Sequence, residues 1–394
     1  MMRRVYLDNN ATTPVLPEIL EAMRPYFGEH FGNASSIHHH GQETRAAVER
    51  SRESVAALLH CRSSELVFTS GGTEADNLAI FGLTREGDHI ITSTIEHHAV
   101  LNACRHLAEA KHCDVTYISV DGRGLLDPVD VKRAIRPNTK LVTIMFANNE
   151  TGVLQPVAEI GKIAAEADVY FHTDAVQAAG KVTVDVNEIC CDSLTISGHK
   201  FHAPQGVGAL YLRKGTQLEP MLYGGSHERS RRAGTENVAG IVGLGKAAEL
   251  ASASLDRGND AKMAAARDRM ERELLALEAT GLNGADSNSG RAPRVPNTTN
   301  VYFDGIEGEA LVIALDLKGL AVSTGAACSS GAIEPSHVLT AMGLSRDRAK
   351  ASIRFSLGKQ NTEEDVDFAL GLIPETVARL RDLSPTWSKS ALSI

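Results

Sequence analysis

The feature of the sequence that most constrains the fold is an alternation of short apolar segments with longer helix-forming segments between residues 66 and 212. This alternation is typical of strands joined by crossover helices, and such connections produce a mainly parallel sheet. The predicted strands are residues 66–69, 89–92, 115–119, 141–147, 169–172, 194–197 and 208–212. The sequence therefore predicts an α/β domain with a mainly parallel, seven-stranded central sheet and helices on both faces.

The C-terminal part of the chain predicts a smaller α+β unit. Gly, Asn, Ser and Pro are frequent in residues 281–296, which is typical of a linker, and further short strands and helices are expected after it. With 394 residues the chain is long enough for two domains. We expect a large domain at residues 15–258 and a small domain made of residues 1–14 and 259–394.

Charge and cysteine content exclude several classes of protein. The net charge of -9 argues against a general binder of nucleic acid or of membrane surfaces. The N-terminus has two arginines and no apolar stretch, so we expect no signal peptide, and no apolar run has the length of a membrane span. The six cysteines form no C-x-x-C pair, which is typical of a protein in the reducing cytoplasm.

A lysine follows one of the predicted strands at a place where α/β sheets bind ligands. Residues 194–197 form a short, β-branched apolar run, and Lys200 lies just beyond it after a glycine. The carboxyl ends of the strands in such sheets border the ligand crevice. A partly desolvated lysine there can lose its proton and form a Schiff base with an aldehyde. On its own, a lysine that reaches out to water is the commoner case.

Polar residues follow the other predicted strands too. The small-residue turn at residues 70–73 opens a helix, and its backbone N–H groups with the Thr73 hydroxyl would bind an anion, unless it is an ordinary capped helix start. It matches neither a Walker A nor a dinucleotide motif. Asp174 ends a strand, where a carboxylate would pair with the pyridine N–H of pyridoxal phosphate or cap a helix.

Further side chains at the same edge would complete such a site. Gln177 lies one turn after Asp174 and would reach the ring hydroxyl, while Asn149 follows a strong strand and would reach the ring or the substrate. His97 would lie flat on the ring face, or would be an ordinary histidine in the first turn of a helix. Together these residues favour a Schiff-base role for Lys200.

Cys328 and Arg354 are candidates from the C-terminal part. Cys328 lies in a run of small residues at 323–332, where a thiol is better placed to react than one among apolar neighbours, unless it is an incidental surface cysteine. Arg354 lies in a β-like segment and needs a carboxylate partner if it is buried. An amino-acid substrate would supply that carboxylate, although a structural ion pair is an equally good explanation.

At this point the sequence resembles a known family, the cysteine desulfurases of the NifS/IscS type within the class V aminotransferases. The resemblance covers nearly the whole chain. It is carried by Tyr6–Thr13, Gly32–Ser36, Gly72–Asn77, Glu96–Val100, Asn148–Gly152, Asp174–Gln177, Ser197–Lys200, Arg232–Thr235, Ser323–Cys328 and Arg354–Gly358. Ala34 and Gln205 depart from residues that are common in the family. The resemblance implies an aminotransferase-like, fold type I enzyme that uses pyridoxal 5'-phosphate.

The resemblance also implies a set of site residues. Lys200 would hold the cofactor covalently and move protons at the substrate Cα, His97 would assist proton transfer, and Cys328 would be the nucleophile. The cofactor-binding residues would be Gly72, Thr73, His97, Asn149, Asp174, Gln177, Ser197, His199, Lys200 and Thr235. The substrate-binding residues would be Asn33, Asn149 and Arg354. Thr235 would reach the phosphate bound by the other subunit, which implies a homodimer.

The implied reaction removes sulfur from L-cysteine, leaving L-alanine and a persulfide on Cys328. The sulfur would pass to an iron–sulfur scaffold or another acceptor protein, and Cys328 could also serve as a transient ligand of a cluster shared with that scaffold. A selenocysteine lyase or an aminotransferase of the same fold is the alternative within enzymes. A catalytically idle scaffold is the alternative outside them. The intact Lys200, Asp174 and Cys328 argue against this last alternative.

Overall fold

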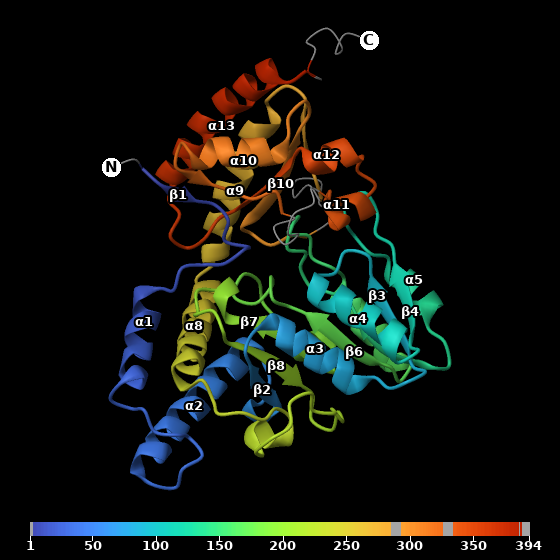
Figure 1. Cartoon of the computed structure of the whole chain (residues 1–394), viewed down its shortest axis with the longest axis vertical. Helices are drawn as coiled ribbons and strands as arrows, with labels where there is room; N and C mark the ends of the chain where they lie inside the picture. Colours follow the sequence, from blue (N-terminus) through green and yellow to red (C-terminus); the bar gives the residue numbers. More distant parts are fainter. Residues whose placement is uncertain (1–2, 285–292, 326–333, 386, 388–394) are drawn as a thin grey trace.

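The central feature of the fold is a seven-stranded sheet with helices on both faces. The structure is a computed structural model that describes residues 3–284, 293–325, 334–385 and 387. The strands follow the order β2 (Leu66–Thr69), β8 (Gly208–Leu212), β7 (Ser193–Ser197), β6 (Tyr170–Asp174), β5 (Thr139–Thr143), β3 (His89–Ser93) and β4 (Asp114–Ile118). The predicted α/β fold and its seven strands are confirmed, and Figure 1 shows this sheet in the lower part of the molecule.

One strand of the sheet runs against the others. β8 pairs antiparallel with both β7 and β2, whereas β3 through β7 pair in parallel. The cause is the connection between β7 and β8, which holds only the short 3₁₀ helix η3 (Gly198–Lys200). A parallel crossover needs about a dozen residues or more, so this short connection returns the chain antiparallel. Lys200 therefore lies in a tight turn at the carboxyl end of β7.

Neighbouring residues on each strand face opposite sides of the sheet. Ile90 and Leu141 pack toward α3 and α4, whereas Ile91 and Val142 belong to the core under α2, α6 and α8. Apolar residues at successive positions are expected in a sheet covered on both faces. The helices associated with this sheet are α1 (Pro17–Met23), α2 (His39–Leu58), α3 (Gly72–Leu83), α4 (His98–Ala110), α5 (Pro128–Ala134), α6 (Val157–Glu166), α7 (Val186–Ile189) and α8 (Val238–Asp256). Three 3₁₀ helices accompany them: η1 (Arg24–Phe27), η2 (Ser63–Glu65) and η4 (His227–Ser230).

A second apolar core joins the start of the chain to its C-terminal part. Val5 and Leu7 pack there with residues from 270 to 377. Its elements are β1 (Val5–Tyr6), α9 (Asn259–Leu275), β9 (Thr280–Leu282), β10 (Thr298–Phe303), α10 (Gly308–Asp316), β11 (Leu320–Ala321), β12 (Ser352–Ser356) and α13 (Glu363–Leu383). The short helices α11 (His337–Ala341) and α12 (Arg346–Lys350) belong to a smaller apolar cluster with Ile95 and Met145. Figure 1 shows most of them gathered at the upper end of the molecule. The boundaries at residues 14 and 258 remain predictions.

The composition of β9 and that of α8 each suggest something other than what the structure shows. The linker expected from residue 281 begins with β9, because Gly281 pairs with Tyr302 and leaves room for the ring of that tyrosine. α8 is long and apolar enough to cross a membrane by length and composition, with half of its residues buried. It packs along α2 and α1, so burial in the core accounts for its apolar composition.

Two helical glycines, one in α6 on the central sheet and one in α13 of the second core, test how closely the helices pack. A Cβ on Gly161 of α6 would lie 1.9 Å from the carbonyl oxygen of Ile189, whereas a Cβ on Gly371 of α13 would meet nothing within 4 Å. Gly371→Ala should raise the free energy of unfolding by about 0.5–1 kcal/mol, because glycine loses more conformational entropy on folding than alanine. Gly161→Ala should lower it by about 1–3 kcal/mol, because the neighbouring backbone must move. Urea unfolding measures both, and a stabilising Gly161→Ala would contradict the packing of α6 on α7.

Candidate active site

The candidate site lies where the strands of the central sheet end. Asp174 is the last residue of β6, and its strand neighbour in register is Thr195 of β7. Ser197 ends β7, and Lys200 ends the turn that follows. The carboxyl ends of β2, β3 and β5 lead into α3, α4 and the turn at residues 148–152. The predicted strand-end residues are therefore brought to one edge of the sheet, as expected for a ligand crevice in an α/β fold.

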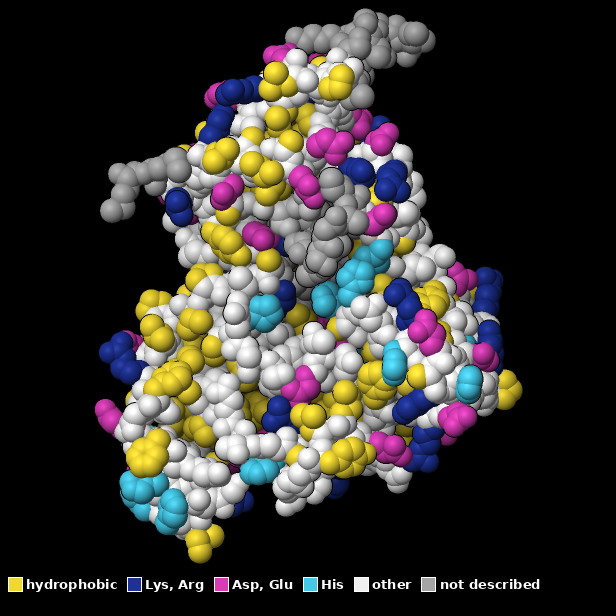
Figure 2. All heavy atoms as spheres, in the orientation of Figure 1, with side chains coloured by type: hydrophobic (Ala, Val, Ile, Leu, Met, Phe, Trp, Pro, Cys, Tyr) yellow, Lys and Arg dark blue, Asp and Glu magenta, His cyan; other side chains and the backbone are white. Residues whose placement is uncertain are grey.

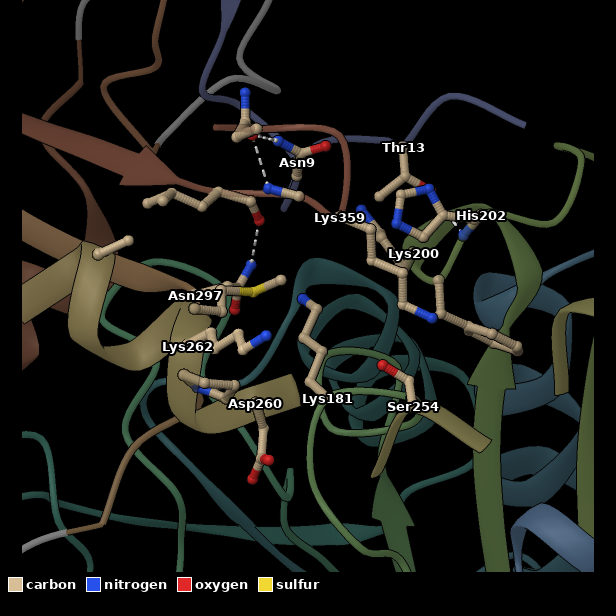
Figure 3. Close-up of a pocket in the computed structure, with 18 of the residues that line it drawn as sticks. Asn9, Thr13, Lys181, Lys200, His202, Ser254, Asp260, Lys262, Asn297 and Lys359 are labelled. Carbon is tan, nitrogen blue, oxygen red and sulfur yellow. Dashed lines mark hydrogen bonds between the residues drawn. The ribbon is translucent and has the colours of Figure 1, made fainter. Parts of the chain in front are cut away.

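The N-terminal segment binds the amine of Lys200. Its Nζ donates to the carbonyl oxygens of Asn10 at 2.8 Å and Ala11 at 2.9 Å. Thr13 donates from its backbone N and its Oγ1 to the carbonyl oxygen of His199, both at 2.9 Å, which ties the same segment to the lysine turn. Figure 3 shows Lys200 and Thr13 among the residues that line a cavity of about 400 Å³. The amine is thus positioned by backbone carbonyls from a distant part of the sequence.

Asp174 supplies a buried acid to the site. One carboxylate oxygen accepts a hydrogen bond from the backbone N of Val176 at 2.9 Å. Burial raises the pKa of Asp174 to about 6, while the Val176 hydrogen bond and the positive charge of Lys200 act in the opposite direction. A positively charged ring nitrogen placed against this carboxylate would keep it ionised.

His97 caps the start of α4 and is neutral in the folded protein. Its Nδ1 accepts a hydrogen bond from the backbone N of Ala99 at 3.1 Å, so the ring proton is carried by Nε2. Burial, with the nearby charge of Lys200, lowers the pKa of His97 to about 4. The ring is 6.4 Å from that of His98, which is 4.7 Å from the ring of His337. Figure 2 shows histidine side chains gathered where the upper and lower parts of the molecule meet.

The first turn of α3 is suited to an anion. Gly71 precedes the helix at a φ of 152°, and a Cβ on Gly72 would lie 2.9 Å from Val176 Cγ2 and 3.9 Å from Ser197 Oγ. The backbone therefore approaches the ends of β6 and β7 closely. The Thr73 side chain is exposed at the first turn of this 12-residue helix. Unpaired N–H groups and the helix dipole favour a phosphate at such a position.

Arg354 joins the two cores at the substrate side of the site. It is 3% exposed, and its Nη2 donates to Asp8 at 2.6 Å while its Nη1 donates to the carbonyl oxygen of Asn149 at 3.0 Å. Its buried Nε has no hydrogen-bond partner within the described residues. The sequence left open a structural ion pair or a substrate contact. The structure shows the ion pair and a further donor that a carboxylate would satisfy.

Two of the described residues that the sequence predicted, Asn33 and Thr235, are not brought to this site. Asn33 is exposed, and its Oδ1 accepts from the backbone N of Ser35 within its own loop. Thr235 is exposed on the loop whose Arg232 pairs with Glu74 at 2.8 Å. Their contacts with substrate or cofactor remain predictions, and Cys328 lies outside the described residues.

The residues that flank the Cys328 segment do reach the site. Ser336 Oγ donates to Glu150 Oε2 at 2.5 Å, and a Cβ on Gly325 would lie 3.0 Å from the same oxygen. Both flanks of residues 326–333 therefore approach Glu150, the immediate neighbour of Asn149. Sequence reasoning did not single out Glu150 or Asp8, although both lie within motifs that carry the family resemblance.

The five described cysteines are free thiols, and burial disfavours the thiolate of Cys61, Cys104, Cys113 and Cys191. Burial raises the pKa of Cys61 and of Cys104 to about 12, and that of Cys191 further still. A thiol that keeps its proton near neutral pH is a poor nucleophile. Within the described residues, His, Cys, Asp and Glu side chains form no group of three that could hold a metal ion.

The fold and the strand-end lysine place the chain in the class of α/β enzymes with a fold type I architecture. The chain belongs to the class V aminotransferase family, whose model matches residues 5–368. It is 50% identical over 390 residues to the cysteine desulfurase IscS of Dictyoglomus turgidum, covering 98% of this chain and 97% of that relative. The family resemblance inferred from the motifs is confirmed.

Solved structures agree with this assignment. A NifS-like protein superposes with a TM-score of 0.88 at 37% identity, covering 96% of this chain and 100% of that chain. A structure of SspA in complex with cysteine superposes with a TM-score of 0.77 at 38% identity, covering 89% of this chain and 98% of that one.

The family implies pyridoxal phosphate, and the residues present fit it. The α3 N-terminus suits the phosphate, Asp174 suits the ring nitrogen, and the Lys200 amine suits the aldehyde. Each of these groups comes from a different strand end, so the fit depends on the tertiary structure.

The neutral state of His97 predicts how stability depends on pH. The pKa of His97 falls from its ordinary value of 6.5 to about 4 on folding. The unfolded chain therefore binds about one more proton between these pH values, and folding stability declines as pH falls through this window. His97→Gln should lower the slope of the free energy of unfolding against pH by about 1.4 kcal/mol per pH unit, which corresponds to one proton. Urea midpoints of cofactor-free protein between pH 4 and 7 measure it.

His39→Gln is the matched control, because the His39 side chain is 79% exposed. An unchanged pH dependence in His97→Gln, or an equal change in the control, would contradict the buried neutral state of His97.

Proposed function

We propose that this protein is a cysteine desulfurase, a sulfurtransferase that removes sulfur from L-cysteine and leaves L-alanine and a persulfide on Cys328. The observation that carries the proposal is that Lys200, Asp174 and His97 lie at one sheet edge while the flanks of the Cys328 segment close on Glu150. The name of the relative from Dictyoglomus turgidum and the cysteine bound to SspA agree with this activity.

In this proposal Lys200 holds pyridoxal 5'-phosphate covalently. The phosphate is bound by the first turn of α3 through Gly72 and Thr73, by Ser197 and His199, and by Thr235 of a second subunit. Asp174 would keep the ring nitrogen protonated, Gln177 would contact the ring hydroxyl, and His97 and Asn149 would contact the cofactor as well. When bound, the cofactor withdraws electrons from the substrate Cα. The Lys200 amine would take the Cα proton of the bound substrate.

Arg354 and Asn149 would hold the substrate carboxylate, together with Asn33. The unpaired Nε of Arg354 is the group that supports this role. A carboxylate seated there orients the cysteine side chain toward the Cys328 segment, because the carboxylate and amine of the substrate are then both fixed.

The sulfur transfer is a displacement at the substrate sulfur. The Cys328 thiolate attacks that sulfur, an S–S bond forms, and the Cβ–S bond breaks. The electron pair of the broken bond stays with the substrate, whose Cβ takes up a proton. Lys200 returns a proton to Cα, and the product leaves as alanine. The persulfide sulfur is then transferred to a scaffold for iron–sulfur cluster assembly or to another acceptor protein. Cys328 would also serve as a transient cluster ligand at that scaffold.

The protein would work as a cytoplasmic homodimer that binds neither nucleic acid nor membrane. Four large apolar side chains support the dimer: Phe27, Phe31, Ile37 and Tyr223 are exposed by 69%, 71%, 92% and 86%. Apolar side chains of this size are often covered by a protein partner. The free thiols of the described cysteines suit the cytoplasm.

Cys328→Ala should abolish persulfide and alanine formation from L-cysteine while the purified protein keeps the yellow colour of bound cofactor. Cys190→Ala is the control and should retain activity. Cys190 is half-buried and lies between α7 and the amino end of β7, whereas the site lies at the carboxyl ends of the strands. Alanine and protein-bound persulfide are measured after one turnover. Full alanine release by Cys328→Ala would instead favour a selenocysteine lyase, a keto acid formed in place of alanine would favour an aminotransferase, and a colourless wild type would favour an idle scaffold.

Arg354→Lys should raise the KM for L-cysteine by about tenfold to a hundredfold, since a lysine cannot reproduce the donor geometry of the guanidinium toward a carboxylate. Arg348→Lys is the control, because Arg348 pairs with Asp304 at the surface. Steady-state kinetics with saturating cofactor separate KM from kcat. An unchanged KM in Arg354→Lys would show that Arg354 serves only its ion pair with Asp8.

A further inference from the structure

An ion pair joins the loop at residues 224–236 to the first turn of α3. Arg232 Nε donates to Glu74 Oε1 at 2.8 Å, and Arg232 Nη2 donates to Glu74 Oε2 at 3.3 Å. The two side chains are only 21% and 18% exposed. Both residues lie within motifs that carry the family resemblance, but sequence reasoning gave neither of them a role. Their surroundings show what the pair does.

Glu74 places a carboxylate at the turn to which the phosphate is assigned. It directly follows Thr73, and its Oε2 accepts from the backbone N of Ser70 at 2.8 Å, so the side chain bridges the turn. Partial burial raises the pKa of Glu74, but hydrogen bonds from Arg232 and Ser70 outweigh it, so the pKa is lowered overall. The carboxylate is therefore ionised at neutral pH. A carboxylate stabilises a helix N-terminus, but it repels a second anion bound there.

The loop that carries Arg232 is held against β2 by a second, buried ion pair. Glu228 accepts two hydrogen bonds from Arg52, both at 2.8 Å, and a third from the backbone N of Phe68 at 3.0 Å. Glu228 and the two residues after it have left-handed φ angles of 44°, 56° and 65°. Such a backbone is unfavourable for residues other than glycine and persists where the surrounding contacts fix it. The buried ion pair supplies those contacts.

The same loop thus braces the phosphate turn on both sides. Glu228 binds Phe68 before the turn, and Arg232 binds Glu74 after it. Figure 1 shows the loop in yellow-green near β2 and α3. Gly234 has a φ of 115°, and a Cβ there would lie 3.1 Å from Arg232 Nη1, so the chain folds back over the guanidinium. The position of the guanidinium is therefore set by contacts from both directions.

Glu74 depends on Arg232 more than the other acids nearby do. The charges of Glu74, Glu228 and Glu236 all act on Arg232. Glu228 also pairs with Arg52, and Glu236 lies 3.1 Å from a histidine ring nitrogen. Among the described residues, Arg232 is the only cation that forms an ion pair with Glu74. Loss of Arg232 would therefore leave the Glu74 charge uncompensated.

We propose that Arg232 is a positioning residue for anion binding at the first turn of α3, where it neutralises the Glu74 carboxylate and holds it against Ser70. The inference rests on the proposed function in taking that anion to be the phosphate of pyridoxal phosphate. With Arg232 in place, the N–H groups and dipole of α3 act on the phosphate without opposition from a neighbouring negative charge.

The charge effect is tested by titrating the cofactor-free protein with pyridoxal phosphate and with pyridoxal, which lacks the phosphate. Arg232→Met should weaken binding of pyridoxal phosphate about tenfold and leave binding of pyridoxal unchanged, because only the phosphate is repelled by the uncompensated carboxylate. Adding Glu74→Gln to Arg232→Met should restore most of the lost affinity, because that charge is then gone. The absorbance of the bound cofactor gives the dissociation constants.

Arg229→Met is the matched control. It removes a positive charge from the same loop, but Arg229 donates to the carbonyl oxygen of Ser64, so both affinities should stay the same. Equal losses for pyridoxal phosphate and pyridoxal in Arg232→Met would overturn the proposal, since a merely structural role would cause them. A double variant with no recovery, or an equal loss in Arg229→Met, would overturn it too.

Inorganic phosphate separates this inference from the proposed function. Phosphate should raise the melting temperature of the cofactor-free wild type, and Arg232→Met should need about tenfold more phosphate for the same rise. If the wild type and the variant behaved in this way but the wild type bound no pyridoxal phosphate, the proposed function would be refuted and the role of Arg232 supported. If the wild type and Arg232→Met bound pyridoxal phosphate equally well, the role of Arg232 alone would be refuted.

Discussion

The active site depends on the segment at residues 9–13, which lies across the carboxyl ends of the central strands. Asn10 is 1% exposed and binds both sides of the molecule. Its backbone oxygen accepts from Lys200, while its side chain donates to Thr298 at 2.8 Å and to the carbonyl oxygen of Asn149 at 3.1 Å. One buried residue thus joins the lysine turn, the turn after β5 and the second core. If one core moved against the other, the carbonyl oxygens that position Lys200 would move as well.

Burial and like charge act together on the ionisable groups of the site. Burial lowers the pKa of His199 to about 4, and the charges of Lys200 and Lys181 act in the same direction. Burial and the charge of Lys200 hold His97 neutral in the same way. The pKa of Asp174 is raised by burial and lowered by Lys200. The positive charges of Lys200 and Arg354 near these groups favour an anionic, proton-accepting ligand. Pyridoxal phosphate and an amino-acid carboxylate both have that character.

Much of the fold followed from local pattern. The strands at residues 66–69 and 208–212 were predicted with the bounds that they have, because β-branched and apolar residues there are bounded by turn residues. β9 was missed because its glycine is a linker signal in the sequence and is explained only by the Tyr302 ring packed over it. α5 was missed although Asp127 caps it and Pro128 begins it. These signals are short, and their meaning depends on neighbours that the sequence does not show.

The sequence by itself determined the class of the protein. The alternation of strands and helices, with Lys200, Asp174 and His97 each placed just after a strand, requires these groups to meet, since parallel strands end at one edge. Only the tertiary structure decided that Asp8 pairs with Arg354, that Lys181 contacts Gln177, and that the flanks of the Cys328 segment meet at Glu150. These contacts join residues from separate turns and from both cores. Hydrogen bonds of that kind follow from how the cores pack, which no local pattern in the chain encodes.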